Sequence, residues 1–227
     1  IWAIARRVLS SAAMVQSLWS DAEAREFVAK YASDHGEDMA LRVYTSRLIG
    51  QDQDLVLHGG GNTSCKTTRR DLVGEELDVI AVKGSGHDLV DIEPSGLPFL
   101  EIEPLRRLMR LEALSDDEMV NEVRRQLLDT GAPNPSVEAL LHAALPHKYV
   151  DHTHADAILI LTNQLDGEAM GREALGDRVA ILPWIMPGFP LAKAMAKAYA
   201  DNPDVEGVVL LQHGIFTFGD DARAGYE

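Results

Sequence analysis

Two histidines in the segment 151–154 (Asp-His-Thr-His) have the spacing of metal ligands on a strand. Side chains at positions i and i+2 of a β-strand point to the same face, so His152 and His154 can reach one ion. Neutral imidazole is a common ligand of zinc and similar divalent metals. Two partly exposed histidines at the end of a strand explain the same spacing equally well. The pattern therefore needs a third ligand before it favours a metal site.

His213 is the candidate for that third ligand. It follows an apolar segment and precedes Gly214, which places it at a strand end, where catalytic groups gather in α/β sheets. A lone histidine at such a position is more often structural. Here, however, an ion bound by His152 and His154 would need a third ligand, and His213 can provide it. We therefore predict that the three histidines bind one divalent ion, zinc or another transition metal. One coordination position should stay open for substrate or for Glu138.

Glu138 has the chemistry of a proton-transfer group, and two other interpretations compete with that role. Its carboxylate lies near the start of a predicted helix, where acids are favoured simply by the helix dipole. His142 follows four residues later on the same helical face, so the two residues form a rival metal pair. We rank that pair below the strand histidines because His142 lies among Leu and Ala, as a buried structural histidine would.

Two glycine-rich loops follow predicted strands and could hold an anion. One reads HGGGNTS at residues 58–64 and the other KGSG at 83–86, and neither matches a Walker P-loop or the dinucleotide fingerprint GxGxxG. Backbone N–H groups in such loops can bind phosphate. We expect free N–H groups at Asn62, Ser85, Gly86 and Ser136, with the Lys83 side chain as a further donor. On their own, glycines after a strand indicate only a turn.

These residues are distributed over an alternation of short strands and helices. The predicted strands span residues 54–58, 62–66, 77–83, 97–102, 148–154, 179–183, 205–212 and 215–219. The predicted helices span residues 21–49 with a break near His35 and Gly36, a segment that begins at Glu103, and 115–129, 136–145, 156–162, 167–175 and 191–200. No linker divides the chain, so we expect one α/β domain with a mixed sheet.

Composition restricts the partners and the compartment. The 227 residues include 21 Lys+Arg and 36 Asp+Glu, a net charge of −15, which disfavours binding to nucleic acid or to anionic membrane surfaces. No apolar segment approaches the roughly 18 residues of a membrane helix. Cys65 is the single cysteine, so no internal disulfide forms and a reducing compartment, the cytoplasm, is expected.

The first residues do not fit the domain. Residues 1–13 contain two Arg, two Ser and no acid, a composition similar to that of a transit segment. We favour the simpler interpretation that they extend upstream of a true start at Met14. The expected boundaries are an extension or start-site artefact at 1–16 and one domain at 17–227.

Five motifs carry a family resemblance. GGGNTS, KGSG, PSVE, HTH and QHG, in this order, resemble the class II aldolase/adducin family, and the resemblance covers the chain from about residue 17. Longer segments, such as HKYVDHTHADAILILT and QHGIFTFGD, are similar to the aldolase half of bifunctional rhamnulose-1-phosphate aldolase/short-chain dehydrogenases. The resemblance implies a three-layer α/β fold, in which helices flank a central, mixed and mostly antiparallel sheet.

The same resemblance implies a role for each candidate residue. The three histidines match the family's zinc ligands, and Glu138 matches its general acid/base. The family holds the substrate phosphate at positions that match Asn62, the loop of Ser85 and Gly86, and Ser136. A related branch has a second serine where this chain has Val137, and Lys83 is the candidate to replace that donor.

The implied activity is a lyase reaction of rhamnose catabolism. The metal acts as a Lewis acid on L-rhamnulose 1-phosphate, the C4 hydroxyl loses its proton, and the C3–C4 bond breaks. The acid/base then protonates the enediolate fragment. The products are dihydroxyacetone phosphate and lactaldehyde, and no Schiff-base lysine is needed.

Other functions compete with the aldolase as interpretations of these motifs. A sugar-phosphate epimerase or dehydratase would share the metal site, so only the products separate it from an aldolase. A non-catalytic adducin-like interaction domain would lack the metal histidines, and their retention argues against it. A dehydrogenase is rejected for these residues because the chain has no Rossmann glycine fingerprint.

The resemblance also implies assembly. Related aldolases are homo-oligomers, with a tetramer favoured here, and some use a catalytic tyrosine at a subunit boundary, for which Tyr226 is the candidate. Residues from Asp220 have the composition of a helix N-terminus, and a helix that stops at Glu227 would be marginal. We therefore expect a domain truncated at its C-terminus, with a short-chain dehydrogenase domain downstream.

Overall fold

A seven-stranded sheet forms the centre of the molecule. The computed structural model describes residues 17–227, so the predicted extension at 1–16 lies outside the described residues. The strands are β1 (Asn62–Arg70), β2 (Glu76–Val82), β3 (Phe99–Glu101), β4 (Tyr149–Thr153), β5 (Val179–Leu182), β6 (Gly207–Leu210) and β7 (Gly214–Gly219). Their order across the sheet is β3-β2-β1-β4-β7-β6-β5. All neighbours pair antiparallel except β5 and β6, which confirms the predicted mixed, mostly antiparallel sheet.

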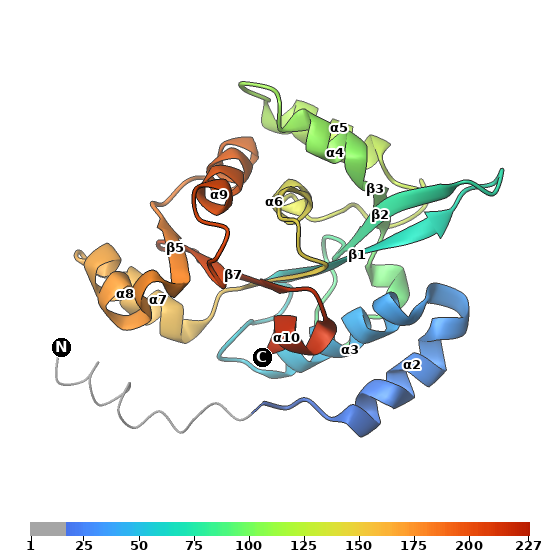
Figure 1. The fold of residues 1–227 in the computed structure, drawn as a ribbon, viewed down its shortest axis with the longest axis horizontal. Helices are drawn as coiled ribbons and strands as arrows, with labels where there is room; N and C mark the ends of the chain where they lie inside the picture. The colour runs from blue at the N-terminus through green and yellow to red at the C-terminus, as the bar shows by residue number, and fades with distance from the viewer. Residues whose placement is uncertain (1–16) are drawn as a thin grey trace.

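Helices cover both faces of the sheet (Figure 1). One face carries α4 (Ile102–Leu108), α5 (Asp116–Arg125), α6 (Ala139–Ala144) and α9 (Phe189–Asp201). The other carries α2 (Asp21–His35), α3 (Glu37–Gln51), α7 (Asp156–Thr162), α8 (Gly167–Leu175) and α10 (Ala222–Tyr226). Short 3-10 helices lie at η1 (Pro94–Gly96) and η2 (Gly176–Arg178). The predicted three-layer architecture is therefore confirmed. None of the helices within residues 17–227 combines the length and apolar character needed to cross a bilayer.

Strand β4 shows how the sheet divides its residues between the two layers. Tyr149 packs in the apolar cluster on the α3 side, whereas Val150 packs in the cluster on the α6 side. Asp151 contacts α3 through Arg42, and His152 faces the N-terminus of α6. Because side chains alternate along a strand, the acid and the first histidine of the Asp-His-Thr-His segment lie on opposite faces.

Residues 54–58 form turns rather than the predicted strand. The amides of Leu55 and Val56 both donate to the carbonyl of Asp52, and Val56 is buried in the cluster on the α3 side. Leu55 and Val56 therefore reflect packing against this cluster and not a place in the sheet. The chain enters the sheet at Asn62, and β1 runs to Arg70, beyond the predicted end, in a hairpin with β2.

Two helices differ from the predicted bounds. The helix that begins at the Ser115 capping box ends at Arg125, because Leu127 leaves it to form a bridge beside the sheet. The next helix, α6, begins after Glu138 and not at Ser136. The break predicted between the first two helices is confirmed at Gly36, whose φ of 87° lies in the left-handed region that favours glycine.

A buried ion pair joins the α3 layer to the middle of the sheet. Arg42 Nη1 lies 2.7 Å from Asp151 Oδ1, and both side chains are almost wholly buried. The same guanidinium donates to the Ser64 carbonyl of β1 at 3.2 Å and to the Thr45 hydroxyl at 2.6 Å. These bonds replace part of the hydration that the charges lose on burial. Arg42 thus ties β1 and β4 to α3 on the face opposite His152.

Arg42→Met should lower the free energy of unfolding by about 3–5 kcal/mol, because it leaves the Asp151 carboxylate buried without its partner. Urea denaturation at constant pH measures the loss. Lys197→Met is the control, because it breaks the exposed Lys197–Asp201 pair, and exposed pairs contribute little. Equal losses of unfolding free energy in the two variants would contradict the larger contribution assigned to the buried ion pair.

Candidate active site

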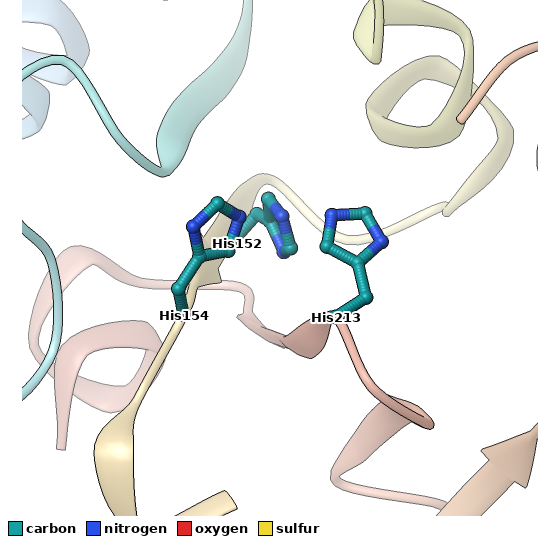
Figure 2. A group of neighbouring side chains, drawn as sticks. All are labelled: His152, His154 and His213. Carbon is teal, nitrogen blue, oxygen red and sulfur yellow. The ribbon is translucent and has the colours of Figure 1, made fainter. Parts of the chain in front are cut away.

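The three predicted metal-binding histidines lie together at the end of the central strands. His152 is on β4, His154 follows that strand, and His213 lies in the turn between β6 and β7. Each offers one nitrogen, and these atoms lie within 4.8 Å of one another. Figure 2 shows the three imidazoles side by side, with His152 between the other two. The cluster can hold a divalent metal ion.

The turn before β7 brings His213 to this position. Gln212 has a φ of 60°, in the left-handed region, where it reverses the chain after β6. Gly214 then starts β7 so close to β4 that a Cβ there would lie 2.2 Å from the Thr153 carbonyl oxygen. Only glycine permits this approach, which carries His213 next to the strand that holds His152.

Hydrogen bonding fixes the orientation of His152, which is wholly buried. Its Nδ1 lies 3.1 Å from the Ile215 carbonyl oxygen, so Nδ1 carries the proton and donates. Its Nε2 is buried without a hydrogen-bond partner among the described residues, 3.5 Å from Glu138 Oε2. A buried polar atom without a partner is costly unless a ligand binds it. The donor set therefore fits a divalent ion, because metal-binding histidines commonly donate their second ring nitrogen to a carbonyl.

Burial keeps these imidazoles neutral. Desolvation, with a smaller effect of His154, lowers the pKa of His152 to about 3. Desolvation and the neighbouring His152 lower the pKa of His213 to about 4, although Glu138 opposes the shift. Burial also lowers the pKa of His154. Since a metal ion binds the neutral form, the folded chain presents its ligands in the required state near neutral pH.

Glu138 faces the histidines and does not cap its own helix. It occupies the N-cap position of α6, but its side chain makes no capping hydrogen bond. Oε1 lies 3.5 Å from His213 Nε2, and Oε2 accepts a hydrogen bond of 2.7 Å from the Asn62 amide. The carboxylate thus lies where it can bind a metal ion or exchange a proton with a substrate.

His142 takes no part in the metal cluster. It is wholly buried, its Nδ1 lies 2.8 Å from Ser64 Oγ, and its Nε2 is hydrogen-bonded to Asn62 Oδ1. Both ring nitrogens are therefore engaged by protein groups. The rival pair of Glu138 and His142 has no free imidazole nitrogen to offer an ion.

Two of the histidines, His154 and His213, border a cavity of about 320 Å³ together with Glu138, and this volume suits a small ligand. Both glycine-rich loops line it, as do residues 136–138, His154 and His213. His152 lies behind this lining. All the residues predicted to bind an anion therefore surround the same space as the histidine cluster.

Two of the predicted anion donors do not have free backbone amides. The Ser85 amide donates to the Asn134 carbonyl at 2.7 Å, and the Ser136 amide donates to the Lys83 carbonyl at 3.0 Å. The expectation of free N–H groups at these serines is therefore wrong, and they offer their hydroxyls instead. The amide of Gly86 donates to no described residue, and its φ of 84° favours glycine.

Lys83 brings a positive charge to the loop end of the cavity. Its ammonium donates to the Gly59 carbonyl at 2.9 Å, which links the two glycine-rich loops and leaves two protons for other acceptors. Burial lowers the pKa of Lys83, while Asp88 and Glu138 oppose the shift. Val137 is half exposed in the cavity wall and provides no donor.

One residue of the cavity wall was not anticipated, and the candidate tyrosine lies apart from the cavity. Pro187, in the loop between β5 and α9, lines the cavity, and its neighbours carry no polar group whose spacing could have indicated this. Tyr226 lines a different cavity, and its hydroxyl accepts from the Leu18 amide at 3.3 Å. It therefore lies outside the histidine site of its own chain.

A sequence model of the family described as Class II Aldolase and Adducin N-terminal domain matches residues 40–227. The chain therefore belongs to the class II aldolase and adducin family. The uncharacterized oxidoreductase YuxG of Bacillus subtilis (strain 168) is 40% identical over 185 residues, which are 82% of this chain and 27% of that protein. The chain thus spans about a quarter of the length of this relative.

Solved structures agree with this assignment. The N-terminal class II aldolase domain of a conserved protein from Thermoplasma acidophilum is 42% identical, with a TM-score of 0.78 over 83% of this chain and 87% of that chain. A sugar-phosphate aldolase from Thermotoga maritima has a TM-score of 0.60 over 84% of this chain and 88% of that chain. Its identity of 15% shows a shared fold alone. The predicted family and fold class are confirmed.

The metal-free protein should lose stability as the pH falls from about 6.5 to about 4. His152 and His213 have folded-state pKa values of about 3 and about 4, so below about 6.5 the unfolded chain takes up protons that the folded chain does not. Each histidine adds a slope of up to about 1.4 kcal/mol per pH unit. Urea denaturation of chelator-treated protein at several pH values measures this slope. The slope should be smaller in His152→Gln. A wild-type stability that is flat over this range would contradict the burial of neutral imidazoles.

Proposed function

We propose that this chain is a divalent-metal-dependent aldolase that cleaves a ketose 1-phosphate, with L-rhamnulose 1-phosphate as the preferred substrate. One observation carries the proposal: neutral histidines and a buried carboxylate border the same cavity as two glycine-rich loops with a lysine. Such a cavity offers a metal site at one end and anion donors at the other. Family membership and the motif resemblance support the same reaction. The products would be dihydroxyacetone phosphate and lactaldehyde.

In this proposal the ion is held by the imidazoles of His152, His154 and His213. Zinc is the first choice because imidazole suits it, although imidazole also suits iron, nickel and copper ions. When bound, the ion supplies Lewis-acid stabilisation of the negative charge that develops on the substrate oxygens. The hydrogen bond from His152 to Ile215 orients one ligand before the ion arrives.

Glu138 moves the proton in the proposed reaction. Cleavage of the C3–C4 bond leaves an electron pair on the phosphate-bearing fragment, which must gain a proton at C3. The Glu138 carboxylate borders the cavity at 5% exposure, so it can transfer that proton away from bulk water. In the reverse direction the same group removes the proton.

The other end of the cavity binds the phosphate. The proposed donors are the Lys83 ammonium, the hydroxyls of Ser85 and Ser136, and the Gly86 amide. The Asn62 amide lies between these donors and Glu138. A cation at this position compensates for the donor that Val137 does not provide. The neutral imidazoles and the lysine also allow an anion to enter a protein whose net charge is −15.

The proposal extends to the whole protein. The relative named as an oxidoreductase is much longer than the aligned part, so we propose that a dehydrogenase domain accompanies this one and uses the aldehyde product. We further propose a cytoplasmic homo-oligomer, a tetramer in the favoured form, in which Tyr226 is the candidate for a residue offered to a neighbouring subunit. The mass of the full-length protein in solution tests the assembly.

A panel of ketose 1-phosphates that differ in configuration at C3 and C4 tests the reaction itself. Release of dihydroxyacetone phosphate, with L-rhamnulose 1-phosphate cleaved fastest, is the expected result. Recovery of an isomer that keeps all its carbons would indicate an epimerase, and loss of water would indicate a dehydratase. No turnover by metal-loaded full-length protein would favour an adducin-like interaction domain.

Protein purified without chelator should contain about one divalent ion per chain, because three imidazoles with an open position form one site. Elemental analysis measures the content. His213→Ala should lose most of the ion and the cleavage activity, whereas His147→Ala, outside the cavity, should retain both. Full activity in a chain free of metal would remove the basis of the proposal.

Glu138→Gln should lower kcat by about 100- to 10,000-fold, because an amide cannot act as a general acid/base. Thermal unfolding should change little, since the Glu138 side chain makes no capping hydrogen bond. Glu118→Gln is the matched control: Glu118 caps α5 through Ser115, lies outside the cavity, and should leave kcat unchanged. A kcat within a few-fold of wild type in Glu138→Gln would assign proton transfer to another group.

Lys83→Met should raise the KM for a ketose 1-phosphate by about 10- to 100-fold, the value of one hydrogen bond to a charged group. The kcat should change much less, because the phosphate does not react. The unphosphorylated ketose is the internal control, since its KM should be the same in both proteins. An equal rise in KM for both sugars would place Lys83 elsewhere in the mechanism.

A further inference from the structure

A chain of buried hydrogen bonds ends at Glu138 and includes two residues that do not line the cavity. It runs from Ser64 on β1 through His142 on α6 to Asn62, and from Asn62 to the Glu138 carboxylate. The Ser64 Oγ to His142 Nδ1 distance is 2.8 Å, and the Asn62 Nδ2 to Glu138 Oε2 distance is 2.7 Å. No member is more than 6% exposed, so water does not compete for these bonds.

The carboxylate at the end sets the direction of every bond in the chain. A carboxylate oxygen only accepts, so Asn62 must turn its NH₂ group to Glu138 and its carbonyl oxygen to His142. That carbonyl oxygen also only accepts, so His142 must carry its proton on Nε2. Its Nδ1 is then an acceptor, and the Ser64 hydroxyl donates to it. Every proton of the chain therefore points towards Glu138.

This arrangement makes the two oxygens of Glu138 different. Oε2 is held by the Asn62 amide. Oε1 is buried, has no hydrogen-bond partner among the described residues, and lies 3.5 Å from His213 Nε2. A proton on Oε2 would have to displace the bond from Asn62, whereas a proton on Oε1 displaces nothing.

We propose that His142 is a positioning residue that acts through Asn62 to fix Glu138, so that Oε1 is the oxygen that exchanges the substrate proton. The inference rests on the proposed function and deepens it. Without the Nε2–H group of His142, the Asn62 amide can turn over and present its oxygen to the carboxylate. Glu138 would then lose both its charge-stabilising donor and its fixed orientation.

A purely structural role for His142 makes a different prediction. Its ring also packs edge-to-face on Phe216 at 5.4 Å, so removing it could simply weaken the core. Such a loss lowers stability but leaves the rate of the correctly folded fraction unchanged. A positioning role lowers the rate of proton transfer, and a side chain that restores the N–H donor restores that rate.

The test isolates the proton-transfer step. Dihydroxyacetone phosphate in D₂O should exchange its C3 proton with solvent through Glu138 without breaking a carbon–carbon bond, and NMR follows this exchange. His142→Leu keeps a similar volume without the donor, whereas His142→Gln keeps an N–H group near the position of Nε2. We expect exchange to fall about 10- to 100-fold in His142→Leu, as for other residues that orient an active-site group, and to be largely retained in His142→Gln. The metal content should be unchanged in both.

His147→Leu is the matched control. Its ring stacks on Phe218 with centroids 4.5 Å apart and bonds to the Tyr199 hydroxyl at 3.1 Å, but it does not line the active-site cavity. It should lower the thermal midpoint and leave the exchange rate intact. Wild-type exchange in His142→Leu, or equal losses in the two His142 variants, would overturn the proposal.

A second readout does not depend on activity. In ¹⁵N NMR spectra, the His142 ring should be the Nε2–H tautomer. Asn62→Asp should keep this tautomer, because a carboxylate oxygen also accepts from Nε2–H, whereas Ser64→Ala should shift the Nδ1 signal, because it removes the donor to that nitrogen. The opposite tautomer would overturn the hydrogen-bond order inferred here. If the wild-type protein neither cleaves ketose 1-phosphates nor exchanges the proton, the proposed function fails, and this spectrum alone decides whether His142 orients Glu138.

Discussion

The register of β4 between β1 and β7 is the constraint on which the site depends. In this register Asn62 lies opposite His152 on one side and Phe216 lies opposite it on the other. A shift of one residue would turn His152 towards α3 and Asp151 towards Glu138. The buried pair of Arg42 and Asp151 opposes that shift, because it keeps the acid on the α3 face. An interaction on one face of the sheet thereby fixes the imidazoles on the other.

The site is also electrostatically unlike the rest of the molecule. The chain carries a net charge of −15, yet its cavity is bordered by neutral imidazoles, one carboxylate and the Lys83 ammonium. Burial keeps the imidazoles uncharged, as the low pKa values of His152 and His213 show. The cavity can therefore accept a cation at the histidines and an anion at the loops without a change in the surrounding charge.

Much of the fold could be predicted because its signals are local. The capping box at Ser115 indicates the start of a helix, and Gly36 indicates the break between the first two helices. The histidines could be grouped because the i, i+2 rule places His152 and His154 on one face and leaves a ligand missing. Local patterns do not give the roles of the grouped residues, and the family resemblance supplies these roles as expectations.

What could not be predicted depends on contacts between distant parts of the chain. In residues 54–58, Leu55 and Val56 pack into the core from a turn, and a short apolar segment has the same sequence pattern in a strand or in a buried turn. The Ser85 amide is engaged by Asn134, far away in sequence. The bond between Ser64 and His142 spans 78 positions, so no spacing rule connects the two residues.

The carbonyl of Ile215 holds the His152 ring in place through the backbone of the neighbouring strand. The ordering of this ligand is therefore part of folding, and little of the free energy of ion binding is spent on it. An ion that binds the folded chain and not the unfolded chain stabilises the fold by about 2.7 kcal/mol at one hundred times its Kd. In the proposed metal-dependent enzyme, the supply of a trace metal would therefore influence how much folded chain a cell maintains, as well as how fast that chain works.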